Sequence, residues 1–112
     1  MKDTARMLLG IAREVVSDSW IVFPRIAGIG DSTYNAIHFE LQKLVDRVRV
    51  NEGVGVVMAR VDDGKEMRIG VALTPHEARD GILRAIGATA SKLARRNGID
   101  GMEMYGLLVK RG

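Results

Sequence analysis

The sequence contains no cysteine among its 112 residues. Disulfide bonds, thiolate metal sites and cysteine nucleophiles are therefore excluded, and the composition fits a reducing compartment, so we expect a cytoplasmic location. Long apolar runs are missing as well, because the longest stretches without a formal charge are residues 32–39 and 69–76. A membrane span needs roughly 20 apolar residues, so we expect no membrane contact.

Aromatic residues are scarce, at 4% of the chain, and the charge is only slightly unbalanced, at +3. A small positive excess permits contact with nucleic acid or another acidic partner without identifying one. The content of hydrophobic residues, 46%, is high enough for a folded core, and the length suits one domain over residues 1–112.

Three segments have the spacing of amphipathic helices. The first covers residues 4–18, and the second follows Asp31, Ser32 and Thr33, residue types that cap helix N-termini. The third begins with a capping box and a proline at residues 74–77, and Asn97-Gly98 favours a left-handed stop. The expected buried stripes are Tyr34, Ile37, Leu41, Leu44, Val45 and Val48 in the second helix and Ala78, Ile82, Ile86, Thr89 and Leu93 in the third.

Two β-rich runs, residues 53–61 and 66–73, predict a hairpin. Asp63-Gly64 between them fits a tight turn with positive φ at both positions, and we expect Asp62 to pair with Lys65. Residues 20–23, stopped by Pro24, predict a short edge strand or an extended connector. Residues 102–110 predict a last strand. The faces expected to lie together in the hairpin are Val54, Val56 and Met58 with Ile69, Val71 and Leu73.

The pattern as a whole predicts an α+β fold. We expect an antiparallel sheet of three or four strands with helices packed on one face, in the order α-(β)-α-β-β-α-β. The order of the strands in space does not follow from the sequence.

Basic residues cluster toward the C-terminus, where they could contact the phosphates of nucleic acid. The alternative is a cationic helix end that is favoured by the helix dipole. The cluster consists of Lys92, Arg95, Arg96, Lys110 and Arg111.

Two predicted surfaces carry small or apolar residues where polar ones are usual, which suggests association between copies. One is the second face of the hairpin, around Val57 and Ala59. The other lies on the third helix, at Gly87, Ala88 and Ser91, with Ala94 also expected away from the core stripe. Glycine inside a helix costs about 1 kcal/mol relative to alanine, so Gly81 and Gly87 suggest the close approach of another backbone.

Evidence for catalysis is weak. The loop of residues 28–32 could hold an anion or present Ser32 as a nucleophile, but a flexible turn and a helix cap explain it more simply. Neither His38 nor His76 belongs to a recognisable catalytic or metal-binding pattern. We therefore expect no catalytic residue, no metal and no cofactor.

Three functional hypotheses follow. The first is a non-enzymatic, homo-oligomeric binding protein whose basic residues meet an acidic partner such as nucleic acid. The second is a protein-interaction or assembly component without nucleic-acid binding. The third is a small ligand-binding protein or enzyme that uses the loop of residues 28–32.

Overall fold

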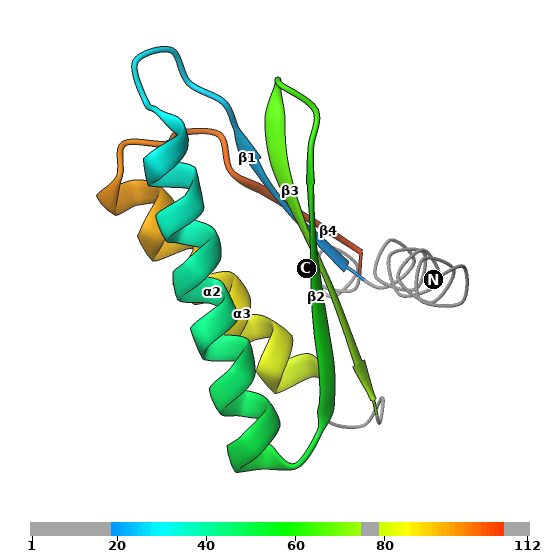
Figure 1. Cartoon of the computed structure of the whole chain (residues 1–112). Coiled ribbons are helices and arrows are strands. Elements are labelled where there is room, and N and C mark those ends of the chain that lie inside the picture. Colours follow the sequence, from blue (N-terminus) through cyan, green and yellow to red (C-terminus); the bar gives the residue numbers. More distant parts are fainter. Residues whose placement is uncertain (1–18, 75–78, 107–112) are drawn as a thin grey trace, which may run out of the picture.

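The computed structural model describes residues 19–74 and 79–106. Its elements follow the order β1 (Ser19–Pro24), α2 (Asp31–Glu52), β2 (Gly55–Asp62), β3 (Glu66–Thr74), α3 (Arg79–Arg96) and β4 (Glu103–Gly106). All strand pairs are antiparallel, in the spatial order β2-β3-β1-β4. Both helices pack on one face of the sheet (Figure 1). This confirms the α+β fold class and is the βαββαβ topology of ferredoxin-like folds.

Some predicted segments fall outside the described residues. These are the helix at residues 4–18, the capping box beyond Thr74, Ala78 of the third-helix stripe, and the last strand beyond Gly106. In the part of the chain that the structure describes, neither helix is long and apolar enough to cross a bilayer.

Strand β1 lies in the interior of the sheet, which corrects the prediction of an edge strand or connector. It pairs with β3 on one side and with β4 on the other. Ile21, Val22 and Phe23 are all at most 5% exposed, as expected for a strand that has a neighbouring strand on each side. Pro24, the reason for expecting an edge, stands at the last position of β1, where its missing N–H interrupts only the end of the ladder.

The hairpin of β2 and β3 has the predicted facing residues but a different turn. Asp62 pairs with Met67 instead of Lys65, a shift of two residues that leaves every side chain on its predicted face. Among the residues described, only glycines have positive φ, so Asp63 does not adopt the predicted conformation and Gly64, at 86°, does. The Asp63 carboxylate instead accepts the N–H groups of Lys65 and Glu66, both at 3.0 Å, which lowers the pKa of Asp63.

Helix α2 buries the predicted stripe but begins differently. Tyr34, Ile37, Leu41 and Val45 are buried, and Leu44 and Val48 pack against the core. The N-cap is Gly30, with no side-chain hydrogen bond, so Asp31, Ser32 and Thr33 do not cap the helix as predicted. Asp31 is the first helical residue and pairs with Arg25 instead.

Helix α3 ends as predicted, but the side that it buries differs from the predicted side by a rotation about the helix axis. The N–H of Ile99 donates to the carbonyl of Ala94 at 2.8 Å, and that of Gly98 donates to Arg95 at 3.2 Å, which together form a Schellman motif. The buried residues are Leu83, Ile86, Gly87, Ala90, Leu93 and Ala94, whereas Ile82 and Thr89 are half-buried. Both stripes satisfy a period of 3.6 residues, so the spacing could not distinguish them.

Two glycine-to-alanine substitutions with opposite expected effects test the turn. Neither Gly64 nor Gly81 has an atom within 4 Å of an added Cβ, but only Gly64 has positive φ. Gly64→Ala should lower the free energy of unfolding by about 1 kcal/mol because of the left-handed backbone. Gly81→Ala should raise it by up to about 1 kcal/mol because alanine favours the helix. Urea unfolding measures both, and a Gly64→Ala protein as stable as the parent would contradict the turn geometry.

Candidate functional site

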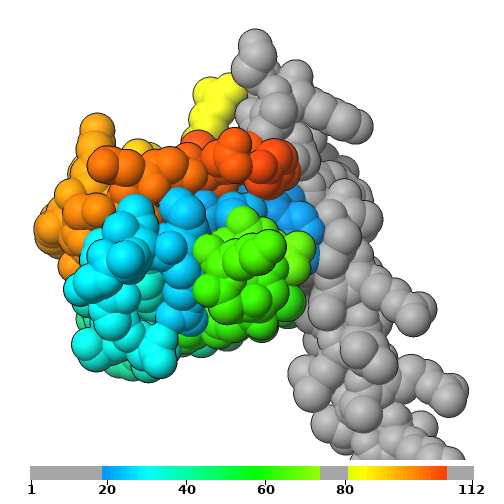
Figure 2. Space-filling model, turned by 90° about the horizontal axis from the view of Figure 1, so that it is seen from above, coloured from blue at the N-terminus to red at the C-terminus, as the bar shows by residue number. Residues whose placement is uncertain are grey.

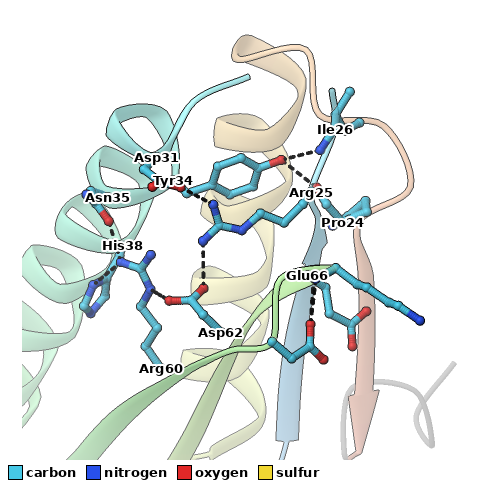
Figure 3. Close-up of polar contacts among 12 residues, drawn as sticks. Pro24, Arg25, Ile26, Asp31, Tyr34, Asn35, His38, Arg60, Asp62 and Glu66 are labelled. Atoms are coloured by element: carbon cyan, nitrogen blue, oxygen red, sulfur yellow. Dashed lines mark hydrogen bonds and ion pairs between the residues drawn. The ribbon is translucent and has the colours of Figure 1, made fainter. Parts of the chain in front are cut away.

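The densest polar cluster lies where β1 ends, α2 begins and β2 ends (Figure 3). Arg25, directly after β1, forms ion pairs with Asp31 at the start of α2 and with Asp62 at the end of β2, the latter at 3.1 Å. Its side chain is only 21% exposed. Arg25 therefore ties three elements together, although its Nε is buried without a hydrogen-bond partner.

Tyr34 stabilises the same junction, where β1 ends and α2 begins, from within the core. Its hydroxyl donates to the carbonyl of Pro24 at 2.7 Å and accepts the N–H of Ile26 at 2.9 Å. The ring is fully buried, and the guanidinium of Arg25 lies 4.6 Å from its centroid. Tyr34 thus fixes the chain where it leaves β1.

Arg60 extends the cluster along α2. It donates to Asp62 at 2.8 Å, to the amide oxygen of Asn35 at 2.9 Å and to Nδ1 of His38 at 3.2 Å. A guanidinium only donates, so Nδ1 of His38 accepts and the ring is neutral with its proton on Nε2. Burial, with a further contribution from the positive charge of Arg60, lowers the pKa of His38.

This arrangement supports a structural role for the cluster. Its two arginines and two aspartates balance in charge and bond to one another, and His38 is held by Arg60. Ser32, the nucleophile of the third hypothesis, is exposed, while the Nδ1 atom of His38 faces Arg60 instead. Within residues 19–74 and 79–106, no three metal-ligating side chains form a group.

The face of the sheet turned away from α2 and α3 is mostly apolar. The strand register places Ala59, Gly70, Trp20 and Tyr105 in one row across all four strands. The neighbouring row contains Val61, Arg68, Val22 and Glu103. Tyr105 is 45% and Val61 37% exposed, whereas Val57, Ala59, Ala72 and Trp20 are half-buried. This face includes the predicted residues Val57 and Ala59 and continues the hairpin surface across β1 to β4.

Charges of both signs border this face. Arg68 lies 5.9 Å from the centroid of the Trp20 ring and forms an ion pair with Asp63 at 3.3 Å. On the opposite border, the hydroxyl of Tyr105 donates to Glu103 at 2.7 Å, which raises the pKa of Tyr105. The face therefore has an apolar centre and a border that carries both positive and negative charges.

The basic residues of α3 lie together at its C-terminal end. Lys92, Arg95 and Arg96 are all exposed there. Viewed from above, this end of α3 (orange) lies at the same end of the molecule as the first turn of α2 (cyan) and the β2–β3 turn (green) (Figure 2). Lys110 and Arg111 lie outside the described residues.

The small-residue surface of α3 is only partly accessible. Gly87 and Ala94 are buried in the single chain, Ser91 is half-buried and Ala88 is exposed. Gly87 and Ala94 were predicted to lie away from the core, and the rotation of α3 explains the difference. Ala88 and Ser91 are the members that another molecule could reach.

Comparison with known proteins identifies the fold and no family. No protein-family model matches the sequence, and no curated protein matches it either. Among solved structures, the chain is similar to "De novo designed protein Ferredog-Diesel", with a TM-score of 0.59 and 11% sequence identity. The similarity covers 78% of this chain and 80% of the designed one. At that identity the similarity concerns the fold alone.

The hydroxyl of Tyr34 can be tested by Tyr34→Phe. Loss of the hydroxyl leaves the Pro24 carbonyl and the Ile26 N–H without their partner, so the free energy of unfolding should fall by about 1–3 kcal/mol. Tyr105→Phe is the matched control, because its hydroxyl is exposed, and it should change stability by less than about 0.5 kcal/mol. Equal effects of the two substitutions in urea unfolding would contradict the proposed junction.

The lowered pKa of His38 predicts a pH dependence of stability. Above about pH 6.5 the group is neutral in both folded and unfolded chains. As the pH falls below that value, the unfolded chain takes up a proton that the folded chain still excludes, so the free energy of unfolding should decrease. His38→Gln keeps an acceptor for Arg60 and should remove this decrease. Identical pH profiles for both proteins between pH 7.5 and 5.5, roughly one unit either side of the histidine pKa, would contradict the assignment.

Proposed function

We propose that this chain is a non-enzymatic binding protein that works as a homodimer. Two copies pair through the sheet face turned away from α2 and α3, which we call the pairing face. Its members are Val57, Ala59, Ala72, Trp20, Val61 and Tyr105, bordered by Arg68 and Glu103.

One observation carries the proposal. An antiparallel sheet with one face in water normally alternates apolar and polar residues, and its solvent face carries long polar side chains. Here the row that crosses all four strands, Ala59, Gly70, Trp20 and Tyr105, contains no charged residue. Contiguous apolar surface of this kind is typical of protein interfaces.

The border charges favour a second copy of the chain over an unrelated partner. A two-fold interface must be self-complementary, because the same patch is used twice. Arg68 and Glu103 stand in one row, on opposite sides of Val22. A two-fold axis that runs parallel to the strands and passes near that residue would bring Arg68 of one copy toward Glu103 of the other, which places unlike charges together.

The alternative pairing surface on α3 has weaker support. Of the two glycines that suggested close backbone approach, Gly87 is buried within the chain and only Gly81 is exposed. The exposed members beside Ala88 include Arg84 and Lys92. A symmetric contact through that surface would bring like charges together, which disfavours association.

Side-chain contacts and composition support a protein that is non-enzymatic and cytoplasmic. The titratable groups that lie close together form ion pairs or hydrogen bonds with one another, which supports binding over catalysis. They are Arg25, Asp62, Arg60 and His38. The absence of cysteine fits a cytoplasmic location. An assembly component without an acidic partner would share the same pairing face, so the nature of the partner is a separate question.

Two alanine-to-glutamate substitutions test the pairing face against α3. Ala59→Glu places a carboxylate within the proposed interface, where burial of an unpaired charge costs several kcal/mol, so the dimer should dissociate. Ala88→Glu introduces the same charge on the exposed side of α3 and should leave the dimer intact. Light scattering at protein concentrations on the order of 50 μM gives the mass, and circular dichroism confirms that both variants fold.

The proposal is wrong if the parent protein is monomeric at that concentration. It is also wrong if Ala88→Glu dissociates the dimer and Ala59→Glu does not, because the contact would then lie on α3.

A further inference from the structure

The exposed side of α3 between residues 81 and 96 carries charge of one sign only. Residues 81–96 contain no aspartate or glutamate. Its exposed side carries four basic residues, Arg84, Lys92, Arg95 and Arg96, which we call the cationic face of α3. At 100° per residue, all four lie within about one third of the helix circumference.

The charges of the cationic face are not neutralised by the protein. None of the four side chains forms an ion pair or hydrogen bond with the residues that the structure describes. Arg25, Lys43, Arg49, Arg60 and Arg68, in contrast, each have a carboxylate partner within 4.0 Å. The fold therefore separates structural basic residues from free ones and collects four of the free ones on one helix.

The helix dipole explains only part of this distribution. Positive charge is favoured in the last turn of a helix, which accounts for Arg95 and Arg96. Arg84 is the sixth residue of the helix as described, and Lys92 precedes the last turn. Neither position gains from the dipole, so their presence on the same side as Arg95 calls for another cause.

We infer that the cationic face of α3 binds the phosphate backbone of nucleic acid. The inference rests on the proposed binding function and names the class of its partner. From Arg84 to Arg96 the helix rises about 18 Å, which spans about five phosphates of one strand of a duplex. Gly81, Ala85 and Ala88 are the other exposed residues of this side, so α3 itself presents no bulky side chain to a strand there. Gly81 and Ala85 also line a groove with Val48 and Glu52 of α2.

The composition of this side also disfavours an anionic membrane. A helix that lies in a membrane surface inserts large apolar residues between its cations. The cationic face has only glycine and alanine between them. It has no aromatic residue either, so base stacking is not expected and the binding should be independent of sequence.

Salt dependence of binding to duplex DNA is the direct test. Each phosphate contact contributes about −0.9 to the slope of log K against log salt, so four contacts give about −3.6. Fluorescence anisotropy of the full chain with two labelled duplexes of unrelated sequence, at roughly 50 to 200 mM salt, should give this slope and equal affinities. Arg84→Gln with Lys92→Gln should reduce the slope by about 1.8.

A matched pair of single substitutions locates the contact. Lys92→Gln should reduce the slope by about 0.9. Lys65→Gln removes the same charge from another exposed and unpaired lysine, in the β2–β3 turn, and should leave the slope unchanged. Equal losses from both substitutions would show a general charge effect and overturn the inference.

Two further results would overturn it. One is no binding to either duplex at the lowest salt concentration. The other is binding to vesicles containing phosphatidylserine under conditions where neither duplex binds. Light scattering on the same samples distinguishes the two proposals. A dimer that does not bind DNA contradicts this inference alone, and a monomer that binds DNA contradicts only the proposed dimerisation.

Discussion

The position of β1 between β3 and β4 is the constraint on which the other features depend. It makes β1 parallel to β2 and β3 parallel to β4, because each pair is separated by one antiparallel strand. The helices α2 and α3 connect these parallel pairs, and the strong preference for right-handed crossovers places both on the same side of the sheet. Neither of these helices covers the opposite side of the sheet, which forms the proposed pairing face, and α3 presents its cationic face outward.

Some local signals in the sequence predicted local structure correctly, although the hairpin turn and the cap of α2 differ from the prediction. The end of α3 at Asn97-Gly98 and the facing residues of the hairpin depend on turn chemistry and on a period of two, both of which are readable over a few residues. The interior position of β1 depends on pairing with residues about 50 and 85 positions away along the chain, as expected for long-range sheet contacts. No short pattern contains that information, and Pro24 pointed to the wrong position.

The candidate sites likewise divide into those that short sequence patterns predicted and those that depend on long-range contacts. Lys92, Arg95 and Arg96 were identifiable because they lie close together in the sequence, and Val57 and Ala59 because they alternate in one strand. The junction of Arg25 with Asp62 was missed, because 37 residues separate the two partners. Which arginines lack an ion-pair partner also depends on tertiary contacts. Arg84 could therefore be assigned to the basic surface only from the structure, where other arginines, such as Arg25 and Arg60, have carboxylate partners.

The central claim is that copies meet through the pairing face, and Trp20 gives the most direct measurement. It is the only tryptophan in the sequence and stands in the middle of that face. A dilution series followed by both tryptophan emission and light scattering should show the emission maximum moving to longer wavelength over the same range in which the mass halves, because dissociation exposes the indole to water. A mass that halves while the emission stays constant would place the contact elsewhere and contradict the account.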